Sequence, residues 1–314
     1  MTENSDFHST LLQDEQDWQQ LLQSVEQIHS SDPFHCIWHM GDLMWTRYRN
    51  QAIDPRKHIR LWKNAAGELL AFAWFLSYGT TIQVAPDARQ QKVLYEDILN
   101  WAEEYWLTTF ADQPQRRNLW CYAFDDDSFL QEALFQHGFQ RGEDCQLLFF
   151  QELSTELARS ELPIGWTIRP LRNTQEYTRR IEIEFAAWGI GQSFEDYQRM
   201  RAVPEYLPEL DLGVFDTEDT MLAYTTIWLD GQGSCGYFEP VTVHPTAQRQ
   251  GIGRMLLQEG LYQLKNQGAR YARVCPPDDN EGAKKLYASV GFVRHNQTWI
   301  WGKQLRRVEE SIGN

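Results

Sequence analysis

One arrangement of strand, proline and helix occurs twice in this chain of 314 residues. In the second half an apolar stretch ends at Pro245, a helical pattern follows, and a Gly-Phe pair stands at 291–292. In the first half the same order runs from Pro86 to a Gly-Phe pair at 138–139. This repetition predicts an internal duplication, with two domains at 1–155 and 163–308 and a polar linker over 152–163.

Strands and helices alternate in each half. In the second half we expect a strand before Pro245, a helix from about 250 to 267, a short strand near 270–277, a helix from about 279 to 290 and a final strand. This order predicts an α/β fold with a mixed central sheet and helices on its faces. We expect the closing strands at 145–153 and 298–305 to complete the first and second halves respectively.

Two glycine clusters lie on either side of the strand before Pro245. The first, GQGSCG at 231–236, matches a dinucleotide-binding pattern, but an alternating stretch rather than a helix follows it, which predicts a β-turn. The second, QRQGIG at 248–253, stands between a strand and a helix. Amide groups in the first turn of a helix lack partners within the helix, and Gly251 and Gly253 would let a diphosphate approach the backbone. The second cluster is therefore the predicted phosphate loop.

These residues resemble the GNAT superfamily of acetyl-CoA-dependent N-acetyltransferases. The cluster at 248–253 fits the family's [Q/R]-x-x-G-x-[G/A] loop, and the segment 280–292 is similar to its N-x-x-A-x-x-x-Y-x-x-x-G-F segment. The resemblance covers 166–305 well and the first half weakly. It implies two GNAT-like acyl-CoA N-acyltransferase domains in tandem, an architecture similar to that of mycothiol synthase.

The resemblance also assigns roles to particular residues. Tyr287 corresponds to the tyrosine that protonates the departing thiolate, with a helix tyrosine packed on the sheet as the alternative. Glu239 is the candidate general base, and by strand alternation it would share a face with Tyr237, Val241 and Val243; the alternative is a glutamate paired with an arginine. The expected contacts to acetyl-CoA are Val241, Thr242, Val243, Gln248, Arg249, Gln250, Gly251, Ile252, Gly253, Arg254 and Asn280, and Asn280 can also cap the helix that follows it.

The first half lacks the features that the resemblance requires. Its loop reads RQQKVL at 89–94, so Lys92 and Leu94 stand where the second half has glycines. The Gly-Phe register puts Leu134 at the place of Tyr287. We expect a degenerate copy that supports the active domain and contributes at most a wall of the substrate site.

The predicted function is transfer of acetyl from acetyl-CoA, as cosubstrate, to a primary amine of a small molecule. The alternatives are a protein N-terminal or lysine acetyltransferase and a non-catalytic acyl-CoA sensor module. Five aromatic residues precede the loop and could line an acceptor pocket or belong to the core: Trp188, Phe194, Tyr206, Trp228 and Phe238.

Charge and cysteine usage restrict the partners. A formal net charge of −15 argues against nucleic acid or an anionic membrane as the main partner. No apolar run reaches the length of a membrane span, and five scattered cysteines favour a reducing cytoplasm. His35 and His39 lack the glutamate of a zinc-protease helix, so no metal is expected, and the acidic run 125–127 reads as a helix cap. The chain is expected to be a monomer or homodimer.

Overall fold

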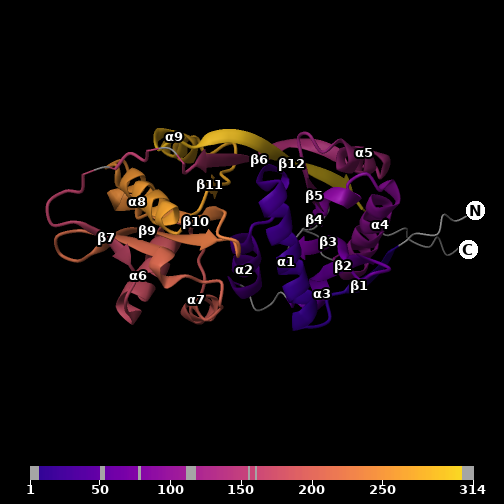
Figure 1. The fold of residues 1–314 in the computed structure, drawn as a ribbon, viewed down its shortest axis with the longest axis horizontal. Coiled ribbons are helices and arrows are strands. Elements are labelled where there is room, and N and C mark those ends of the chain that lie inside the picture. Colours follow the sequence, from indigo (N-terminus) through magenta and orange to yellow (C-terminus); the bar gives the residue numbers. More distant parts are fainter. Residues whose placement is uncertain are drawn as a thin grey trace, which may run out of the picture. The chain divides into compact units, whose positions relative to one another are not determined.

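The computed structural model describes residues 7–49, 54–76, 79–110, 118–154, 156–159 and 161–305. The chain divides into two compact units (Figure 1). The first unit consists of residues 1–24, 54–146 and 296–314, and the second of residues 25–53 and 147–295. Each unit is thus assembled from separate segments of the sequence. The domains predicted at 1–155 and 163–308 are copies of a sequence repeat. Their boundaries stay a prediction, because the boundaries of sequence repeats and of compact units can differ.

The sheet of the first unit has the strand order β1-β2-β3-β4-β5-β12. β4 and β5 pair in parallel, and the other neighbouring strands pair antiparallel. Its strands are β1 (Phe7–Leu11), β2 (Ile59–Asn64), β3 (Leu69–Leu76), β4 (Gly79–Val84), β5 (Asn118–Phe124) and β12 (Val293–Gln304). Its helical elements are residues 15–24 of α1 (Glu15–Ser31), which continues into the second unit, and α3 (Pro55–His58), the 3-10 turn η2 (Pro86–Ala88), α4 (Lys92–Thr109) and α5 (Ser128–Gln136).

Helix α4 buries the apolar face that its sequence predicts. Leu94 and Ile98 are fully buried, and Trp101 packs edge-on against Trp62 of β2 with ring centroids 5.7 Å apart. Burying one such side chain contributes about 1.5–3 kcal/mol relative to leaving it in water. Apolar packing of α4 on the sheet therefore holds this unit together.

The sheet of the second unit has the order β6-β11-β10-β9-β8-β7. Its strands are residues 147–152 of β6 (Gln140–Glu152), which begins in the first unit, and β7 (Thr167–Pro170), β8 (Asp211–Phe215), β9 (Met221–Leu229), β10 (Cys235–Val243) and β11 (Tyr271–Val274). Its helical elements are η1 (Pro33–His35), α2 (Met40–Arg49), α6 (Thr174–Trp188), α7 (Phe194–Arg201), η3 (Pro208–Leu210), η4 (Pro245–Ala247), α8 (Ile252–Asn266) and α9 (Glu281–Ser289).

Helices cover both faces of β9 and β10 in the second unit (Figure 1). α8 lies on one face, where Gly260 leaves room for the ring of Phe238 and the side chain of Ile227. α2 and α6 lie on the other face, where Gly41 of α2 meets the Trp228 side chain and Arg180 of α6 stands 4.3 Å over the Tyr224 ring. β10 is thus enclosed on both sides, as is typical of α/β folds.

The closing strands of the two halves are exchanged, which corrects the expectation that each completes its own half. Residues 298–304 of β12 pair with β5 in the first unit, and residues 149–152 of β6 pair with β11 in the second. Both segments form strands where predicted. Their partners differ because alternation specifies a strand and its faces but not its neighbour.

The cluster GQGSCG forms the turn that its sequence predicts. It connects β9 with β10, where the Gly233 amide donates to the Asp230 carbonyl at 2.7 Å and the Asp230 amide to the Cys235 carbonyl at 3.1 Å. The Asp230 carboxylate also accepts from the Ser234 amide at 2.5 Å. The best-known glycine motif in this chain is therefore the tip of a hairpin.

Candidate active site

The candidate site lies where β10 and β11 separate. The two strands pair in parallel from Cys235 to Tyr237, opposite residues 271–273, and within the described residues their ladder ends there. On its other edge β10 stays paired with β9 as far as Val243, with a bulge between Phe238 and Val241. Pro240, inside the bulge, has no amide hydrogen to donate, so a continuous ladder cannot form at this point.

The bulge changes which side chains share a face with Glu239. Tyr237 lies on the same side, and its hydroxyl donates to Glu239 Oε2 at 3.4 Å. Val241 and Val243 turn to the opposite face, because the extra residue shifts their register against β9 by one. The expectation that all four residues share a face is therefore wrong beyond the bulge, since strict alternation holds only for a regular strand.

Glu239 is partly buried and its main chain is fixed by the indole of Trp228, which donates to the Glu239 carbonyl at 3.2 Å. Its carboxylate lies close enough to the Tyr287 phenol to act on it electrostatically. The predicted base and acid therefore lie within electrostatic reach of each other.

Tyr287 comes from α9, and its ring packs edge-on against Phe292 with centroids 5.8 Å apart. Burial raises the pKa of the Tyr287 phenol, and the nearby Glu239 carboxylate raises it further. A phenol with a raised pKa keeps its proton at neutral pH, as a general acid must. Tyr287 can therefore both pack in the structure and act as an acid, because its ring contacts Phe292 and also carries the hydroxyl group.

Residues 241–243 carry the strand toward the loop. Val241 and Val243 are partly exposed, whereas Thr242 is buried and accepts a hydrogen bond from Trp188 Nε1 at 3.3 Å. The edge of β10 that faces β11 offers main-chain groups along this stretch, because the ladder with β11 has already ended.

The loop between β10 and α8 has an unusual backbone. Arg249 has φ +62° and Gly251 has φ +79°, so two residues in three adopt the left-handed conformation. A side chain added at Gly251 would meet no heavy atom within 4 Å. Alternation of this kind turns successive amide groups to one side and forms an anion-binding concavity, next to the positive end of the helix.

Two glutamine side chains form hydrogen bonds within the loop, and their predicted contacts to acetyl-CoA stay predictions. Gln248 Nε2 donates to the Val243 carbonyl at 3.2 Å, and Gln250 Nε2 donates to the Thr246 carbonyl at 3.4 Å. Their side chains therefore brace the loop, and the Gln248 amide donates to the Pro245 carbonyl at 3.5 Å. Arg249 and Arg254 are exposed and supply positive charge beside the loop.

Gly253 is buried, and an added Cβ would stand 3.1 Å from Leu286 of α9. Its missing side chain lets α8 approach α9, so helix packing already accounts for glycine here. Ile252 is fully buried, and it contributes to the loop only through its main chain. Asn280 caps α9, with its side-chain oxygen accepting from the Ala283 amide at 3.0 Å, as predicted.

Three residues of this site were missed by sequence reasoning: Asp42, Arg273 and Cys275. Arg273 is buried, and its Nε donates to the Cys275 sulfur at 3.1 Å. Its Nη1 and Nη2 donate to the carbonyls of Cys36 and Ile37 at 2.9 and 3.0 Å. Arginine inside a short apolar strand was the one available signal, because a buried guanidinium requires several acceptors.

The aromatic residues before the loop divide into two groups. Tyr206, Trp228 and Phe238 are buried and belong to the core. Trp188 is 54% exposed and Phe194 is partly buried, so these two remain candidates for an acceptor pocket.

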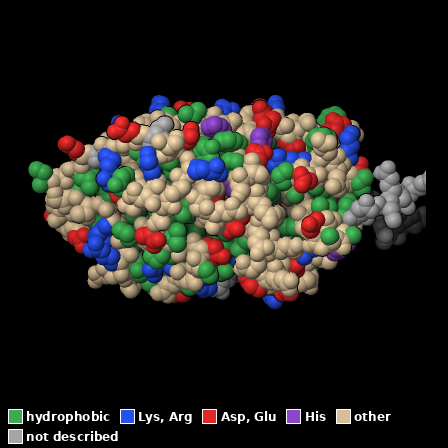
Figure 2. Space-filling view, viewed as in Figure 1, with side chains coloured by type: hydrophobic (Ala, Val, Ile, Leu, Met, Phe, Trp, Pro, Cys, Tyr) green, Lys and Arg blue, Asp and Glu red, His purple; other side chains and the backbone are tan. Residues whose placement is uncertain are grey.

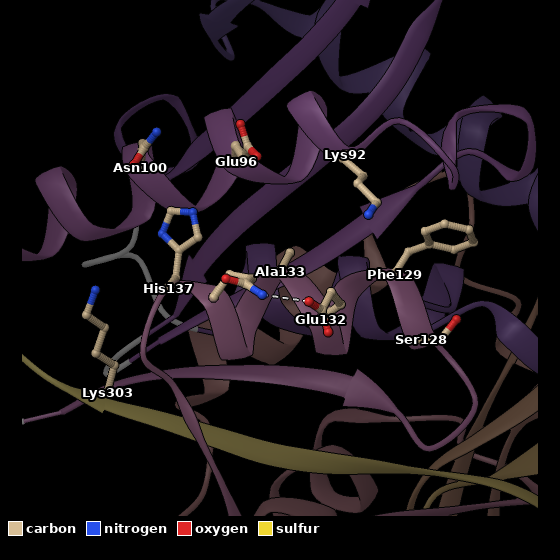
Figure 3. Close-up of a pocket in the computed structure, with 10 residues that line it drawn as sticks. Lys92, Glu96, Asn100, Ser128, Phe129, Glu132, Ala133, His137 and Lys303 are labelled. Carbon is tan, nitrogen blue, oxygen red and sulfur yellow. Dashed lines mark hydrogen bonds between the residues drawn. The ribbon is translucent and has the colours of Figure 1, made fainter.

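The first unit differs at the corresponding loop. Gln90 and Lys92, which match Arg249 and Gly251 in the register of the two halves, do not have a positive φ, and the Gln91 amide is already used by the Ala88 carbonyl at 3.0 Å. A groove of about 790 Å³ lies between α4 and α5, and Lys92 projects toward it from the start of α4 (Figure 3). Leu134 is buried in the core. That the first half is a degenerate copy stays a prediction. The hydrogen bond inside its loop supports this prediction.

No group of three or more metal-ligating side chains occurs within the described residues. His39 is buried, with its Nε2 hydrogen-bonded to the Cys235 carbonyl at 3.1 Å, so it serves packing. Asp127 of the acidic run caps α5, as predicted. In the part of the chain that the structure describes, none of the helices is both long and apolar enough for a membrane crossing.

Known proteins resemble this chain in sequence. Residues 174–292 match the acetyltransferase (GNAT) family. Mycothiol acetyltransferase of Saccharopolyspora erythraea is 32% identical over 158 residues, which are 48% of this chain and 51% of that protein. Mycothiol acetyltransferase of Geodermatophilus obscurus is 27% identical over 62% of this chain and 67% of its own length. The match thus spans only about half the length of the first relative.

Solved structures match nearly the whole chain in fold. A GCN5-related N-acetyltransferase from Sphaerobacter thermophilus has a TM-score of 0.69 at 19% identity, over 97% of this chain and 98% of its own. A tandem GNAT protein from the clavulanic acid biosynthesis pathway has a TM-score of 0.66 at 14% identity, over 95% and 98%. Such identities establish a shared fold and no more. The chain therefore has the fold of the tandem GNAT structures, and its residues 174–292 match the acetyltransferase (GNAT) family.

Proposed function

We propose that this chain is an N-acetyltransferase that moves an acetyl group from acetyl-CoA to a primary amine of a small molecule, and that the second unit carries the activity. One observation carries the proposal: the site where β10 leaves β11 has Glu239 on the strand, Tyr287 within its electrostatic reach, and a left-handed loop at the end of the same strand. A base, an acid and an anion-binding loop are the three parts that this transfer requires.

The loop fits the diphosphate of acetyl-CoA. Open space around Gly251 allows close approach to the backbone, and Arg249 and Arg254 offer charge at the rim. When bound, acetyl-CoA would supply the activated thioester. Main-chain groups of 241–243 on the edge that no longer pairs with β11 would hold the pantetheine and polarise the thioester carbonyl.

Glu239 and Tyr287 would then move the two protons. Glu239 would take a proton from the attacking amine, directly or through water. Tyr287 would donate its phenolic proton to the leaving sulfur, and its raised pKa keeps that proton available. Direct transfer needs no covalent enzyme intermediate, so a nucleophilic side chain is not part of the proposal.

A small molecule is the favoured acceptor. Both relatives named above are called mycothiol acetyltransferases, a name that specifies a small molecule rather than a protein. Acidic and basic side chains are interspersed on the visible face (Figure 2), which offers no single basic patch there for nucleic acid. None of the five cysteines forms a disulfide in the structure, which fits a reducing compartment such as the cytoplasm.

The test is turnover. The purified chain is mixed with acetyl-CoA and a panel of small amines, amino sugars and peptides, free CoA is followed with a thiol reagent, and products are identified by mass spectrometry. Acetylated small amines together with CoA release would support the proposal. Acetylation of peptides alone would favour the protein acetyltransferase, and tight acetyl-CoA binding without turnover would favour the sensor.

A further inference from the structure

Behind Glu239 lies a second carboxylate, reached through one hydroxyl. The Tyr237 hydroxyl stands 3.4 Å from Glu239 Oε2. The Asp42 carboxylate interacts electrostatically with Tyr237. Tyr237 is 4% exposed, so its hydroxyl has little access to water as a competing partner. A phenol has one proton to donate, and here two carboxylates act on the phenol electrostatically.

Arg273 fixes the far end of this chain. Its Nη2 lies 4.0 Å from Asp42 Oδ2, and the guanidinium stands 5.3 Å over the Tyr237 ring. Main-chain carbonyls and the Cys275 sulfur hold its other nitrogens, so the cation cannot swing away. The Asp42 carboxylate therefore has a fixed counter-charge beside it.

Asp42 belongs to α2, which packs against β10 and α7 in the second unit. Its side chain keeps 24% of its surface exposed, whereas Tyr237 is buried. Burial still raises the pKa of the Asp42 carboxyl, with Arg273 acting in the opposite direction. A carboxyl with a raised pKa and partial contact with water can take up a proton and release it to solvent.

We propose that Tyr237 and Asp42 are positioning residues that act through Glu239, forming a proton relay from the acceptor amine to solvent. The inference rests on the proposed function, since it needs Glu239 as the base. As the amine attacks, an N–H bond breaks and the proton binds Glu239. Glu239 then passes a proton to the Tyr237 oxygen as the Tyr237 O–H proton moves to Asp42. No electrons are transferred, Glu239 is ionised again, and Asp42 returns its proton to water.

The other titratable groups around this path hold a fixed charge near neutral pH. The His39 ring lies 5.2 Å from that of Tyr237, and burial lowers its pKa well below the usual range, so it is neutral. Burial raises the pKa of the Cys275 thiol and of Tyr287, so both keep their protons. Arg273 stays cationic. On α7, Arg199 pairs with Asp196, and Arg201 donates to Tyr177 and Tyr206.

The test uses Tyr237→Phe, which keeps the ring and its stacking under Arg273, and Asp42→Asn. Each variant should lower kcat roughly 10-fold or more with little change in KM for acetyl-CoA. The acid limb of the kcat/KM profile should move to higher pH in Tyr237→Phe, because a donor to ionised Glu239 is lost. It should move to lower pH in Asp42→Asn, because a neighbouring negative charge is lost.

A double variant and controls separate a relay from packing. Because both residues serve one path, the double variant should be no slower than the slower single variant, whereas independent effects would multiply. Asp42→Glu should restore part of the rate. Tyr262→Phe and Asp97→Asn serve as controls expected to keep the wild-type profile, and unfolding midpoints verify that each variant folds.

The outcomes distinguish the two proposals. Wild-type turnover with unchanged pH profiles in both variants, or with multiplicative losses in the double variant, would overturn the relay and leave the proposed function standing. Failure of the wild-type chain to acetylate any amine would overturn the proposed function and the relay together.

Discussion

The two units bury different kinds of side chain. Among the described residues, every buried aspartate, glutamate and arginine lies in the second unit: Arg180, Glu184, Asp211, Asp230 and Arg273. The buried polar residues of the first unit are threonines and glutamines: Thr80, Thr81, Gln83, Gln297 and Thr298. Burying charge costs free energy unless partners compensate, so a unit that retains it does so for a local reason. This difference supports the proposal that the catalytic site lies in the second unit.

The loop before α4 and the loop before α8 also differ between the two units. Both follow a strand and a 3-10 turn and lead into a long helix: η2 to α4 in the first unit, η4 to α8 in the second. In the first, Gln90 and Lys92 do not have a positive φ, and the Gln91 amide donates to the Ala88 carbonyl. In the second, the left-handed residues at 249 and 251 open the loop. The two loops therefore share one framework and differ in the backbone angles at two matched positions.

The largest expected effect concerns the buried charges of the second unit. Asp211 accepts hydrogen bonds from Tyr206 at 2.6 Å and Thr226 at 2.9 Å and lies 3.8 Å from Arg180. Asp211→Asn should lower the free energy of unfolding by about 3–5 kcal/mol, because it leaves a buried cation undercompensated. Urea denaturation measures the loss. The exposed Asp97→Asn of the first unit should cost about 1 kcal/mol, and equal costs would contradict the contrast between the units.

The next effect is on catalysis. Tyr287→Phe should lower kcat about 100-fold or more, as for loss of a general acid. The pKa of Tyr287 is raised, so in the wild type the phenol stays protonated and its own deprotonation should reduce kcat only above about pH 10. Steady-state measurements of kcat across pH compare Tyr287→Phe with the wild type and with the control variant Tyr262→Phe. A kcat equal to that of the control would exclude the acid role.

Glutamate substitutions at matching positions of the two loops test which loop binds acetyl-CoA. Gly251→Glu puts a carboxylate into the concavity at a left-handed position, and acetyl-CoA affinity should fall about 100-fold, since like-charge contacts cost several kcal/mol. Lys92→Glu makes a like-charged change at the matching position of the first unit and should leave affinity unchanged. Isothermal titration calorimetry measures the affinity of each variant for acetyl-CoA. If Lys92→Glu weakened binding as strongly, the first loop would also hold ligand.

The smallest effect compares two matched helix caps. Asp127 accepts from the Leu130 amide at 3.0 Å, and Asn280 accepts from the Ala283 amide at the same distance. Replacing either with alanine should cost about 1 kcal/mol of stability. Only Asn280→Ala should also weaken acetyl-CoA binding. Thermal unfolding and titration of the pair would show whether the second cap does more than end a helix, and equal affinities would assign Asn280 to capping alone.

Local features of this chain could be predicted because they depend on neighbours in sequence. Asn280 and Asp127 cap helices as their positions before apolar patterns indicate, and the turn at 231–234 follows from the Asp-Gly pair and the strands around it. The loop at 248–253 forms between a strand and a helix for the same reason. Its role in binding acetyl-CoA stays a prediction.

Non-local features could not be predicted from these patterns. The bulge that turns Val241 away from Glu239 depends on pairing with β9, and strand periodicity does not contain it. Asp42 interacts with Tyr237 across nearly two hundred residues of sequence, so no spacing rule connects them. Arg273 was not identified because its acceptors, the carbonyls of Cys36 and Ile37, lie 237 and 236 residues away in sequence.

The exchanged strands have a consequence for synthesis on the ribosome. Trp299 of β12 donates to Asp125 across 174 residues, so the β5 edge is made long before its partner. At about 5–20 residues per second, that edge waits for roughly 10–35 s. An unpaired strand edge is a template for association with other chains. Nascent chains that stop before residue 296 would keep it, which makes them natural targets for chaperones and proteases.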